Sequence, residues 1–476
     1  MKYIITLLLL ITSTFALAAD APARKRNVLF ITTDDYNVAM GAYGNTVVQT
    51  PNLDRLAARG VRFDRAYCQN PLCNPSRASF MTGLRPNTTG IQNNGPRLRN
   101  RMPDVVTLPQ LFKQNGYVAA RVGKIYHQGI PGGVGKQTHD DELSWDVAIN
   151  PPGAEFATPG PETNPTPDRA QGFRYVMGTT DGEEQHDHQA ATEAIKLLES
   201  RGGGNGDKPL FLAVGFIRPH VPPIAPRKHF DRHPLEKIKL PDVPANDWDD
   251  IPPAAFHAKE PYFAMNEQQS RESIRAYYAS VSFMDEQVGR LLDALDRLKL
   301  TEDTLIVFLG DHGYALGEHR TFQKMLLFEE SARVPLLMAG AGVKGKGTAP
   351  RGIVELIDVY PTVAELCGLK PPAAVEGASV KPLLDDPAAP GKPAAFTQLQ
   401  RKDVDGRSVR TDRWRYTEWN QGANGVELYD HESDPREHTN LAKDPKHADS
   451  VVGLKRMLDR TVPTTRPATR TSPTLP

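Results

Sequence analysis

The chain has few cysteines and no excess of charge of either sign. Only Cys68, Cys73 and Cys367 occur among 476 residues, and so odd and sparse a count argues against a disulfide framework. Cys68 and Cys367 could pair with one another, but buried free thiols are the preferred interpretation. Lys and Arg number 57, as do Asp and Glu, so the formal net charge is zero. This balance removes any general case for nucleic-acid or membrane binding.

Long apolar runs are equally scarce. The one clear case extends from Ile4 to Ala16, after Lys2 and before Ala16-Leu17-Ala18. Such a charged start, apolar stretch and small-residue site are typical of a secretory signal peptide. The run is shorter than the roughly 20 residues that a membrane span needs, and no second one follows. We therefore expect a signal peptide over residues 1–18, no membrane span, and a secreted protein, periplasmic or extracellular.

Short apolar runs alternate with helical patterns through most of the chain. Buried strands are expected at 27–33, 61–66, 117–122, 210–215 and 304–309, and helices at 51–59, 75–83, 107–115 and 266–298. This alternation predicts the α/β class, with a mixed sheet sandwiched by helices. In such sheets, ligands bind at the carboxyl ends of the strands.

The pattern changes beyond about residue 371, where Pro and Ala become frequent. We expect a main domain over 24–375 and a smaller C-terminal α+β domain over 385–462. The smaller domain has antiparallel strand candidates at 408–410, 414–416 and 426–429, and a closing helix near 449–459. Residues 463–476 are rich in Pro, Thr and Arg, and are expected to be disordered.

Polar residues follow several of the predicted strands directly. Asp34 and Asp35 end the first strand, while Asp311 and His312 follow the last. Such carboxylates suit a hard cation such as Ca²⁺, although capping of a turn is the commoner role of any one Asp-Asp pair. Lys124 and His220 also lie just beyond strands, where a solvated surface charge is the simpler interpretation of either residue alone.

One motif points to a specific chemistry. Cys73-Asn74-Pro75-Ser76-Arg77, followed by Thr82-Gly83, resembles the signature of type I sulfatases. Taken alone, Cys73 could equally be a small buried thiol at the mouth of a helix. Further blocks occur in the order and spacing of that family: Asp34-Asp35, Gly123 to His127, Pro219-His220, Asp311 to Lys324, Glu427 to Asp430 and Asn440-Leu441. Within the family, the segments 211–216, 278–283 and 287–292 and the use of His312 resemble the iduronate-2-sulfatase group.

The resemblance implies an alkaline-phosphatase-like fold and a site built around a modified cysteine. In the family, this cysteine becomes Cα-formylglycine, whose hydrated aldehyde attacks sulfur and is later regenerated from an enzyme sulfate ester. The implied Ca²⁺ ligands are Asp34, Asp35, Asp311, His312 and the modified Cys73. The implied catalytic residues are Cys73, Arg77, Lys124, His127, His220, Asp311 and Lys324.

Each implied role has a chemical reason. Arg77 would hold the hydrate and the metal carboxylates, and Asp311 would assist as a base. Lys124 and Lys324 would bind sulfate oxygens and offset the charge that develops in the transition state. His127 would contact the hydrate, while His220 would protonate the departing alcohol.

Other residues are weaker candidates. The group His186-Asp187-His188 has metal-like spacing, but a helix cap or substrate rim is the preferred interpretation. Glu318 and His319 are expected to position Lys324. The pair Trp414-Arg415 could reach a sugar from the small domain, although a structural role is at least as well supported.

The implied reaction is hydrolysis of a sulfuric ester in a sulfated carbohydrate, with a 2-O-sulfated uronic acid of a glycosaminoglycan-like glycan as the leading candidate. The implied partner is a formylglycine-generating or sulfatase-maturating enzyme. Two alternatives stay open. One is a related hydrolase acting on choline sulfate or on a phosphodiester or phosphonate, and the other is an unmodified glycan-binding protein.

Overall fold

The computed structural model describes residues 25–136, 138–155, 157–167, 173–202 and 208–463. The predicted signal peptide at 1–18 lies outside these ranges, as does all but the first residue of the predicted tail at 463–476. Within the described ranges, no helix has the length and apolar character needed to cross a membrane.

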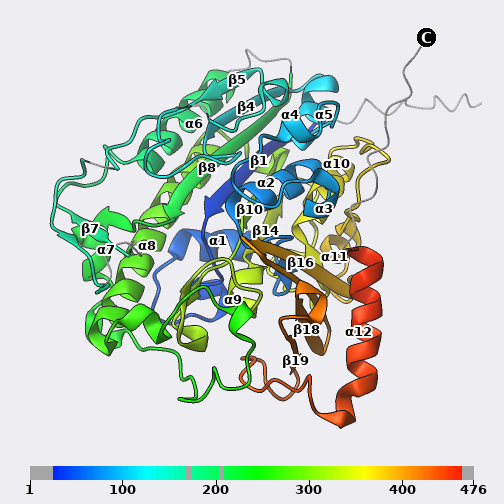
Figure 1. The fold of residues 1–476 in the computed structure, drawn as a ribbon. Helices are drawn as coiled ribbons and strands as arrows, with labels where there is room; N and C mark the ends of the chain where they lie inside the picture. The colour runs from blue at the N-terminus through cyan, green and yellow to red at the C-terminus, as the bar shows by residue number, and fades with distance from the viewer. Residues whose placement is uncertain (1–24, 137, 156, 168–172, 203–207, 464–476) are drawn as a thin grey trace, which may run out of the picture.

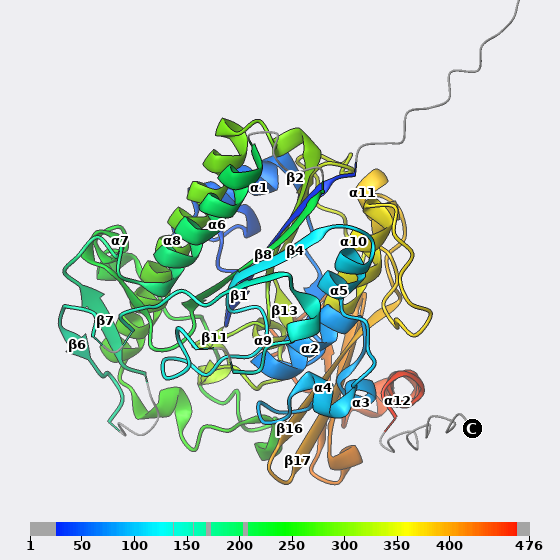
Figure 2. The same ribbon diagram turned by 90° about the horizontal axis from the view of Figure 1, so that it is seen from above.

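A mixed sheet of seven strands crosses the middle of the molecule (Figures 1 and 2). In spatial order its strands are β2 (Gly60–Arg62), β14 (Leu336–Gly340), β10 (Thr304–Gly310), β1 (Asn27–Asp34), β8 (Leu210–Pro219), β4 (Val118–Gly123) and β5 (Val147–Ile149). From β10 to β5 all neighbours are parallel. β14 pairs antiparallel with β10, and β2 with β14. The expected α/β class with a mixed sheet is confirmed.

Helices cover both faces of this sheet. Alternate residues of β1 enter opposite cores, with Leu29 and Ile31 in one and Val28 and Phe30 in the other. Strands buried on both faces are continuously apolar, which is why these runs were recognisable in the sequence. The first face carries α1 (Pro51–Arg59), α6 (His186–Gly202) and α8 (Glu267–Arg297). The second carries α2 (Cys73–Thr82), α5 (Leu108–Gln114) and α10 (Val359–Leu366).

The C-terminal part forms a separate antiparallel sheet of four strands. Its order is β16 (Ala394–Arg401), β17 (Val404–Thr411), β18 (Trp414–Trp419) and β19 (Val426–Asp430). Helix α12 (Ala448–Thr461) packs on it through Leu454 and Leu458. The expected strands at 408–410, 414–416 and 426–429 lie within β17, β18 and β19. β16 was not predicted, because its Gln and Ala residues weaken the alternation.

Shorter elements complete the chain. They are β3 (Ala66–Tyr67), β13 (Arg333–Val334), β15 (Val354–Glu355), β6 (Glu162–Thr163), β7 (Tyr175–Gly178), β9 (Ile224–Pro226), β11 (Ala315–Leu316), β12 (Phe322–Gln323), α3 (Pro86–Thr89), α4 (Leu98–Arg101), α7 (Arg227–Asp231), α9 (Glu329–Ala332) and α11 (Lys381–Asp385).

The prediction of a single strand at 61–66 is wrong. β2 ends at Arg62, and β3 joins β13 and β15 in another sheet. The Phe63 N–H still donates to Leu336 O at 3.0 Å, but Ala66 pairs with Val334 and Val354. An apolar run does not reveal such a change of partner, because both halves are buried.

A buried carboxylate joins the main part of the molecule to the C-terminal sheet. Glu355 is 1% exposed and accepts both Arg85 terminal nitrogens and Lys392 Nζ, each at 2.7 Å. It also accepts the Phe396 N–H of β16 at 2.9 Å. Burial would raise the pKa of Glu355, but the positive charges of Arg85 and Lys392 outweigh it and lower this pKa to about 2.

We expect Glu355→Gln to lower the free energy of unfolding at pH 7 by about 3–5 kcal/mol, because Arg85 and Lys392 lose a buried partner. The folded pKa lies below the unfolded value of about 4.3, so the stabilisation is present above that pH and disappears as pH falls through the folded value. Unfolding measured at several pH values should show the two proteins converging in acid. Glu365→Gln, on an exposed side chain of α10, is the control. Equal effects of the two substitutions at pH 7 would contradict this role of Glu355.

Candidate active site

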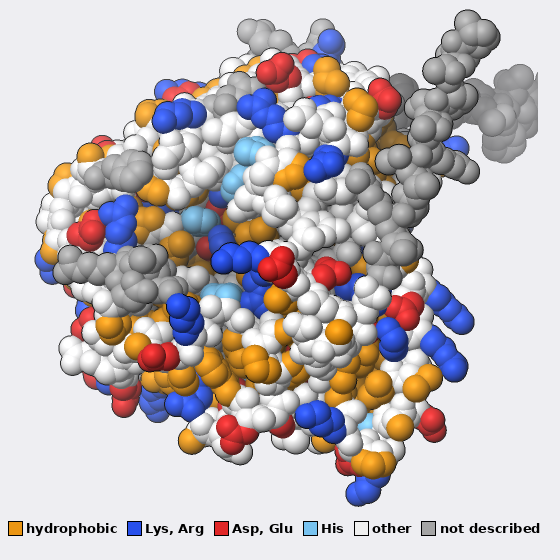
Figure 3. Space-filling model, viewed as in Figure 1, with side chains coloured by type: hydrophobic (Ala, Val, Ile, Leu, Met, Phe, Trp, Pro, Cys, Tyr) orange, Lys and Arg blue, Asp and Glu red, His pale blue; other side chains and the backbone are white. Residues whose placement is uncertain are grey.

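The candidate site lies where the carboxyl ends of the parallel strands meet the start of α2. The face seen in Figure 3 is hollowed near its centre, and histidine side chains gather around the hollow. Cys73 is the first residue of α2, follows the extended residue Leu72, and is 1% exposed. Its Sγ is 3.4 Å from Lys324 Nζ and 3.5 Å from His312 Nε2. Helix N-termini favour anions, so this is a suitable place for a reactive group that meets a sulfate.

The thiol of Cys73 is surrounded by charge. Burial and the Asp34 carboxylate would raise the pKa of Cys73, but the ammonium groups of Lys324 and Lys124 outweigh them. The pKa of this thiol is therefore held well below its ordinary value. His127 lies beside the Cys73 side chain, and burial lowers the pKa of His127.

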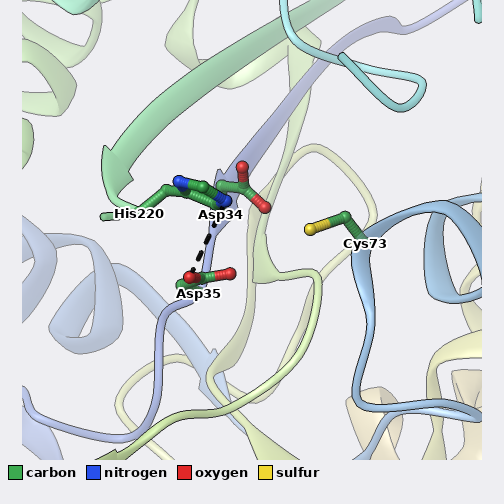
Figure 4. Close-up of side chains that lie close together, drawn as sticks. All are labelled: Asp34, Asp35, Cys73 and His220. Atoms are coloured by element: carbon green, nitrogen blue, oxygen red, sulfur yellow. Dashed lines mark ion pairs between the residues drawn. The ribbon is translucent and has the colours of Figure 1, made fainter. Parts of the chain in front are cut away.

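Three carboxylates converge from two neighbouring strands. Asp34 ends β1, Asp35 follows it, and Asp311 comes directly after β10. Because Thr33 pairs with Gly310 in parallel register, these strand ends are adjacent. The Asp35 N–H donates to Asp311 Oδ1 at 3.1 Å, and Asp35 has a φ of 61°, in the left-handed region. Figure 4 shows Asp34, Asp35 and His220 gathered opposite the Cys73 sulfur.

Arg77 holds this arrangement from the second turn of α2. Its side chain is fully buried, and its Nε donates to Asp311 Oδ2 at 2.8 Å. One terminal nitrogen donates to the carbonyls of Lys124 at 2.7 Å and Ile125 at 3.0 Å. The other lies 3.5 Å from Asp34 Oδ1. A buried guanidinium is stable only with such a full set of partners, so Arg77 fixes the strand ends relative to α2.

Two lysines and one histidine complete the charged lining. Lys124 follows β4 and forms a buried ion pair with Asp34 Oδ2. Lys324 Nζ donates to Asp35 Oδ1 at 2.6 Å. His220 follows β8, with Nε2 3.9 Å from Asp35 Oδ2 and Nδ1 2.6 Å from Val221 O. A carbonyl oxygen only accepts, so the proton of this last hydrogen bond belongs to His220 Nδ1.

The residues present fit a divalent cation. Asp34 Oδ1 and Asp35 Oδ2 are buried and have no hydrogen-bond partner among the described residues. Ligand atoms of Asp34, Cys73, Asp311 and His312 all lie within 4.8 Å of one another. Buried carboxylate oxygens without donors are costly unless a cation satisfies them, and oxygen ligands suit Ca²⁺.

His312 is placed to serve that cation. Its Nδ1 is 2.9 Å from Gly313 O and so carries a proton, while Nε2 lies 3.2 Å from Asp35 Oδ1. Burial would lower the pKa of His312, but the Asp311 carboxylate and its neighbours raise it to about 9. The same negative groups that favour a proton on Nε2 would favour a metal ion there.

The structure thus brings together all the residues that the sequence resemblance implied. It also adds supporting residues that the sequence analysis did not identify. Tyr277 OH donates to Asp35 O at 2.8 Å, and His257 Nε2 contacts Lys324 O at 2.9 Å. Asn74 Nδ2 donates to Asn93 O at 3.0 Å and to Pro96 O at 2.8 Å. Tyr277 has helical apolar spacing, so its sequence context indicates a core residue.

The weaker sequence candidates lie outside this group. Asp187, in the first turn of α6, accepts the N–H groups of Ile217 and Arg218 at the end of β8, at 2.8 and 3.1 Å, and so links helix to strand. His319 contacts Asp247 Oδ2 at 3.0 Å.

Glu318 accepts the Leu316 N–H at 2.6 Å. Lys324 Nζ contacts Asp35 and Cys73 instead, so the expectation that Glu318 and His319 position Lys324 is wrong. Arg415 is 1% exposed and paired with Glu329 and Glu437, so its role is structural. Cys68 and Cys367 are free thiols.

Comparison with known proteins identifies the family. A model of the sulfatase family matches residues 26–369, and one for the C-terminal part of N-sulphoglucosamine sulphohydrolase matches residues 317–463. A sulfatase of Formosa agariphila is 36% identical over 92% of this chain and 87% of its own. Iduronate 2-sulfatase of Homo sapiens is 32% identical, over 90% of this chain and 94% of its own.

The fold agrees with the sequence match. The solved structure of a 2-O GAG sulfatase superposes with a TM-score of 0.70 at 27% identity, covering 92% of this chain and 91% of that one. The mixed sheet between helices, with its C-terminal sheet, is the alkaline-phosphatase-like architecture that the resemblance implied. The chain therefore belongs to the sulfatase family and is a sulfuric ester hydrolase.

Proposed function

We propose that this sulfatase uses Ca²⁺ and a formylglycine made from Cys73 to remove the 2-O-sulfate of a uronic acid in a glycosaminoglycan-like glycan. The observation that carries the chemistry is the position of Cys73, beside Lys324 and facing buried carboxylate oxygens that lack donors. The proposed substrate is inferred from similarity to proteins named iduronate 2-sulfatase and 2-O GAG sulfatase.

Asp34, Asp35, Asp311, His312 and residue 73 would hold the cation. Bound Ca²⁺ would supply positive charge that polarises a hydroxyl of the modified residue and lowers its pKa. Arg77 keeps two of these carboxylates in place through its contacts with Asp311 and Asp34.

The modification gives residue 73 a nucleophilic oxygen that can also leave, because an aldehyde hydrate carries two hydroxyls. In the structure, Cys73 Sγ stands where such a hydroxyl would be, so its neighbours are the groups available to it. Lys324 Nζ is one such neighbour, and His127 is another. A formylglycine-generating or sulfatase-maturating enzyme would have to act on the chain before α2 is buried, since Cys73 is 1% exposed.

The remaining groups serve the sulfate and the leaving alcohol. Lys124 pairs with Asp34 and Lys324 with Asp35, and their ammonium groups would bind sulfate oxygens and offset developing charge. His220 Nε2 faces the site, while Nδ1 is held by a backbone carbonyl, so a protonated ring would donate from Nε2 to the departing oxygen. Asp311 would accept a proton from the attacking hydroxyl.

We also infer that the protein is exported and contributes to degradation of sulfated glycans outside the cytoplasm. This inference comes from the charged start, apolar run and Ala16-Leu17-Ala18 site of the sequence. We also propose that residues 24–375 form the catalytic domain and residues 385–462 the smaller C-terminal domain.

Calcium should stabilise the protein as well as activate it. For a ligand that binds only the folded state, Ca²⁺ at about 100 times its Kd raises the free energy of unfolding by about 2.7 kcal/mol. Asp35→Asn should remove most of this gain, because Asp35 Oδ2 is one of the unpartnered oxygens. Thermal unfolding with EDTA and then Ca²⁺ measures both. Asp293→Asn, at an exposed carboxylate, should keep the full gain. No Ca²⁺ effect on the native protein would contradict the metal assignment.

Modification of Cys73 should be visible by mass spectrometry of the peptide that contains it. Protein made together with a maturating enzyme should carry an aldehyde at residue 73, and sulfatase activity should rise with the aldehyde fraction. Cys73→Ala should be inactive but still folded, as a cooperative thermal transition would show. Cys68→Ala is the matched control, since Cys68 is equally buried and its Sγ donates instead to the Ser331 carbonyl, at 3.7 Å. Activity in protein shown to carry only unmodified Cys73 would disprove this step.

The substrate is tested with a 2-O-sulfated unsaturated uronate disaccharide, using Cys73→Ala as the blank. We expect free sulfate from the modified wild type alone. Choline sulfate and a phosphonate monoester are compared under the same conditions. Faster turnover of either would replace the uronate assignment, and binding without turnover by modified protein would favour the glycan-binding alternative.

A further inference from the structure

A second cleft lies between the main part of the molecule and the C-terminal sheet. It has a volume of about 250 Å³. One wall comes from α3, α4 and the segment between them, and the other from β16 and β17, which lie close together in Figure 2. Its polar lining includes Asn87, Gln92, Asn93, Arg101, Gln400 and Asp405, together with Gln398 and Arg407.

The wall of the cleft is hydrogen-bonded to the residue that follows the nucleophile. Asn93 and Pro96 both line it, and their carbonyls accept the two hydrogen bonds of Asn74 Nδ2, at 3.0 and 2.8 Å. The Asn74 N–H donates to Asn94 Oδ1 at 3.1 Å. Asn74 directly follows Cys73 in the chain, so the residue next to the reacting position is hydrogen-bonded to the wall of the cleft.

Several polar groups in this cleft are uncommitted. Within the described part of the chain, the side chains of Gln92, Gln400 and Arg101 make no hydrogen bond or ion pair. Asn87 Oδ1 is buried and has no partner. Arg407, by contrast, already pairs with Glu418 and Asp459, which leaves Arg101 as the available cation of the cleft.

We propose that this cleft is a second sugar-binding subsite, which holds a residue of the glycan beyond the one that carries the scissile sulfate. Amide side chains offer both a donor and an acceptor, which matches the hydroxyls of a sugar. The Arg101 guanidinium would pair with a carboxylate or sulfate of that sugar. The volume is just below the range of about 300–1,000 Å³ found for small-molecule pockets, so it suits one sugar ring. The inference rests on the proposed function, and it makes an oligosaccharide the preferred substrate.

The test measures binding to full-length Cys73→Ala protein, which does not turn the ligand over. The probes are a tetrasaccharide ending in a 2-O-sulfated unsaturated uronate, and the methyl glycoside of that uronate alone. We expect the tetrasaccharide to bind at least about tenfold more tightly. Adding Arg101→Ala or Gln400→Ala should weaken the tetrasaccharide about threefold to tenfold and leave the Kd of the methyl glycoside unchanged. Arg456→Ala and Gln114→Ala, at exposed side chains elsewhere, are the matched controls.

Equal affinity for the two probes, no binding of the tetrasaccharide, or insensitivity to both cleft substitutions would overturn the subsite. Sulfate release by the modified wild type separates this inference from the proposed function. If the modified wild type releases sulfate from the tetrasaccharide but the cleft substitutions do not change its Kd, the proposed function stands and the subsite is disproved. Sensitive binding without release keeps the subsite and removes the uronate sulfatase assignment.

Discussion

The buried guanidinium of Arg77 is the constraint on which the rest of the site depends. It has no access to water, so its donors must be satisfied by protein acceptors, and these come from the ends of three different strands. Asp311 follows β10, the Lys124 carbonyl follows β4, and the Thr33 carbonyl belongs to β1. One side chain of α2 therefore fixes where the carboxylates of Asp34 and Asp311 lie relative to Cys73.

The charges of the site balance before a metal or substrate is added. Arg77, Lys124 and Lys324 oppose Asp34, Asp35 and Asp311 in direct contacts. A bound divalent cation would leave the site positive, which suits a sulfate ester. This explains how a chain of zero formal net charge can serve an anionic substrate, because the preference is created locally by burial and not by the overall charge.

The sequence predicted the central strands well and the edges poorly. β1, β8 and β10 are buried on both faces and so appear as continuous apolar runs. The break between β2 and β3 left no such signal, since both pieces are buried while only their partners differ. Among the weaker candidates, the expected contact of Glu318 and His319 with Lys324 was wrong for a similar reason. His319 instead contacts Asp247, a partner that sequence distance does not reveal.

The sequence by itself determined which chemical groups stand at the strand ends, because a short apolar run followed by Asp, Lys or His locates a group without any knowledge of packing. It also determined the family, since the Cys73 motif and the Asp311 to Lys324 block are local patterns. Only the tertiary structure decided which of these groups touch. The bond from Tyr277 to Asp35, the junction at Glu355 and the cleft beside Asn93 join segments far apart in the chain. Such contacts depend on how whole helices and sheets pack, and local periodicity carries no record of that packing.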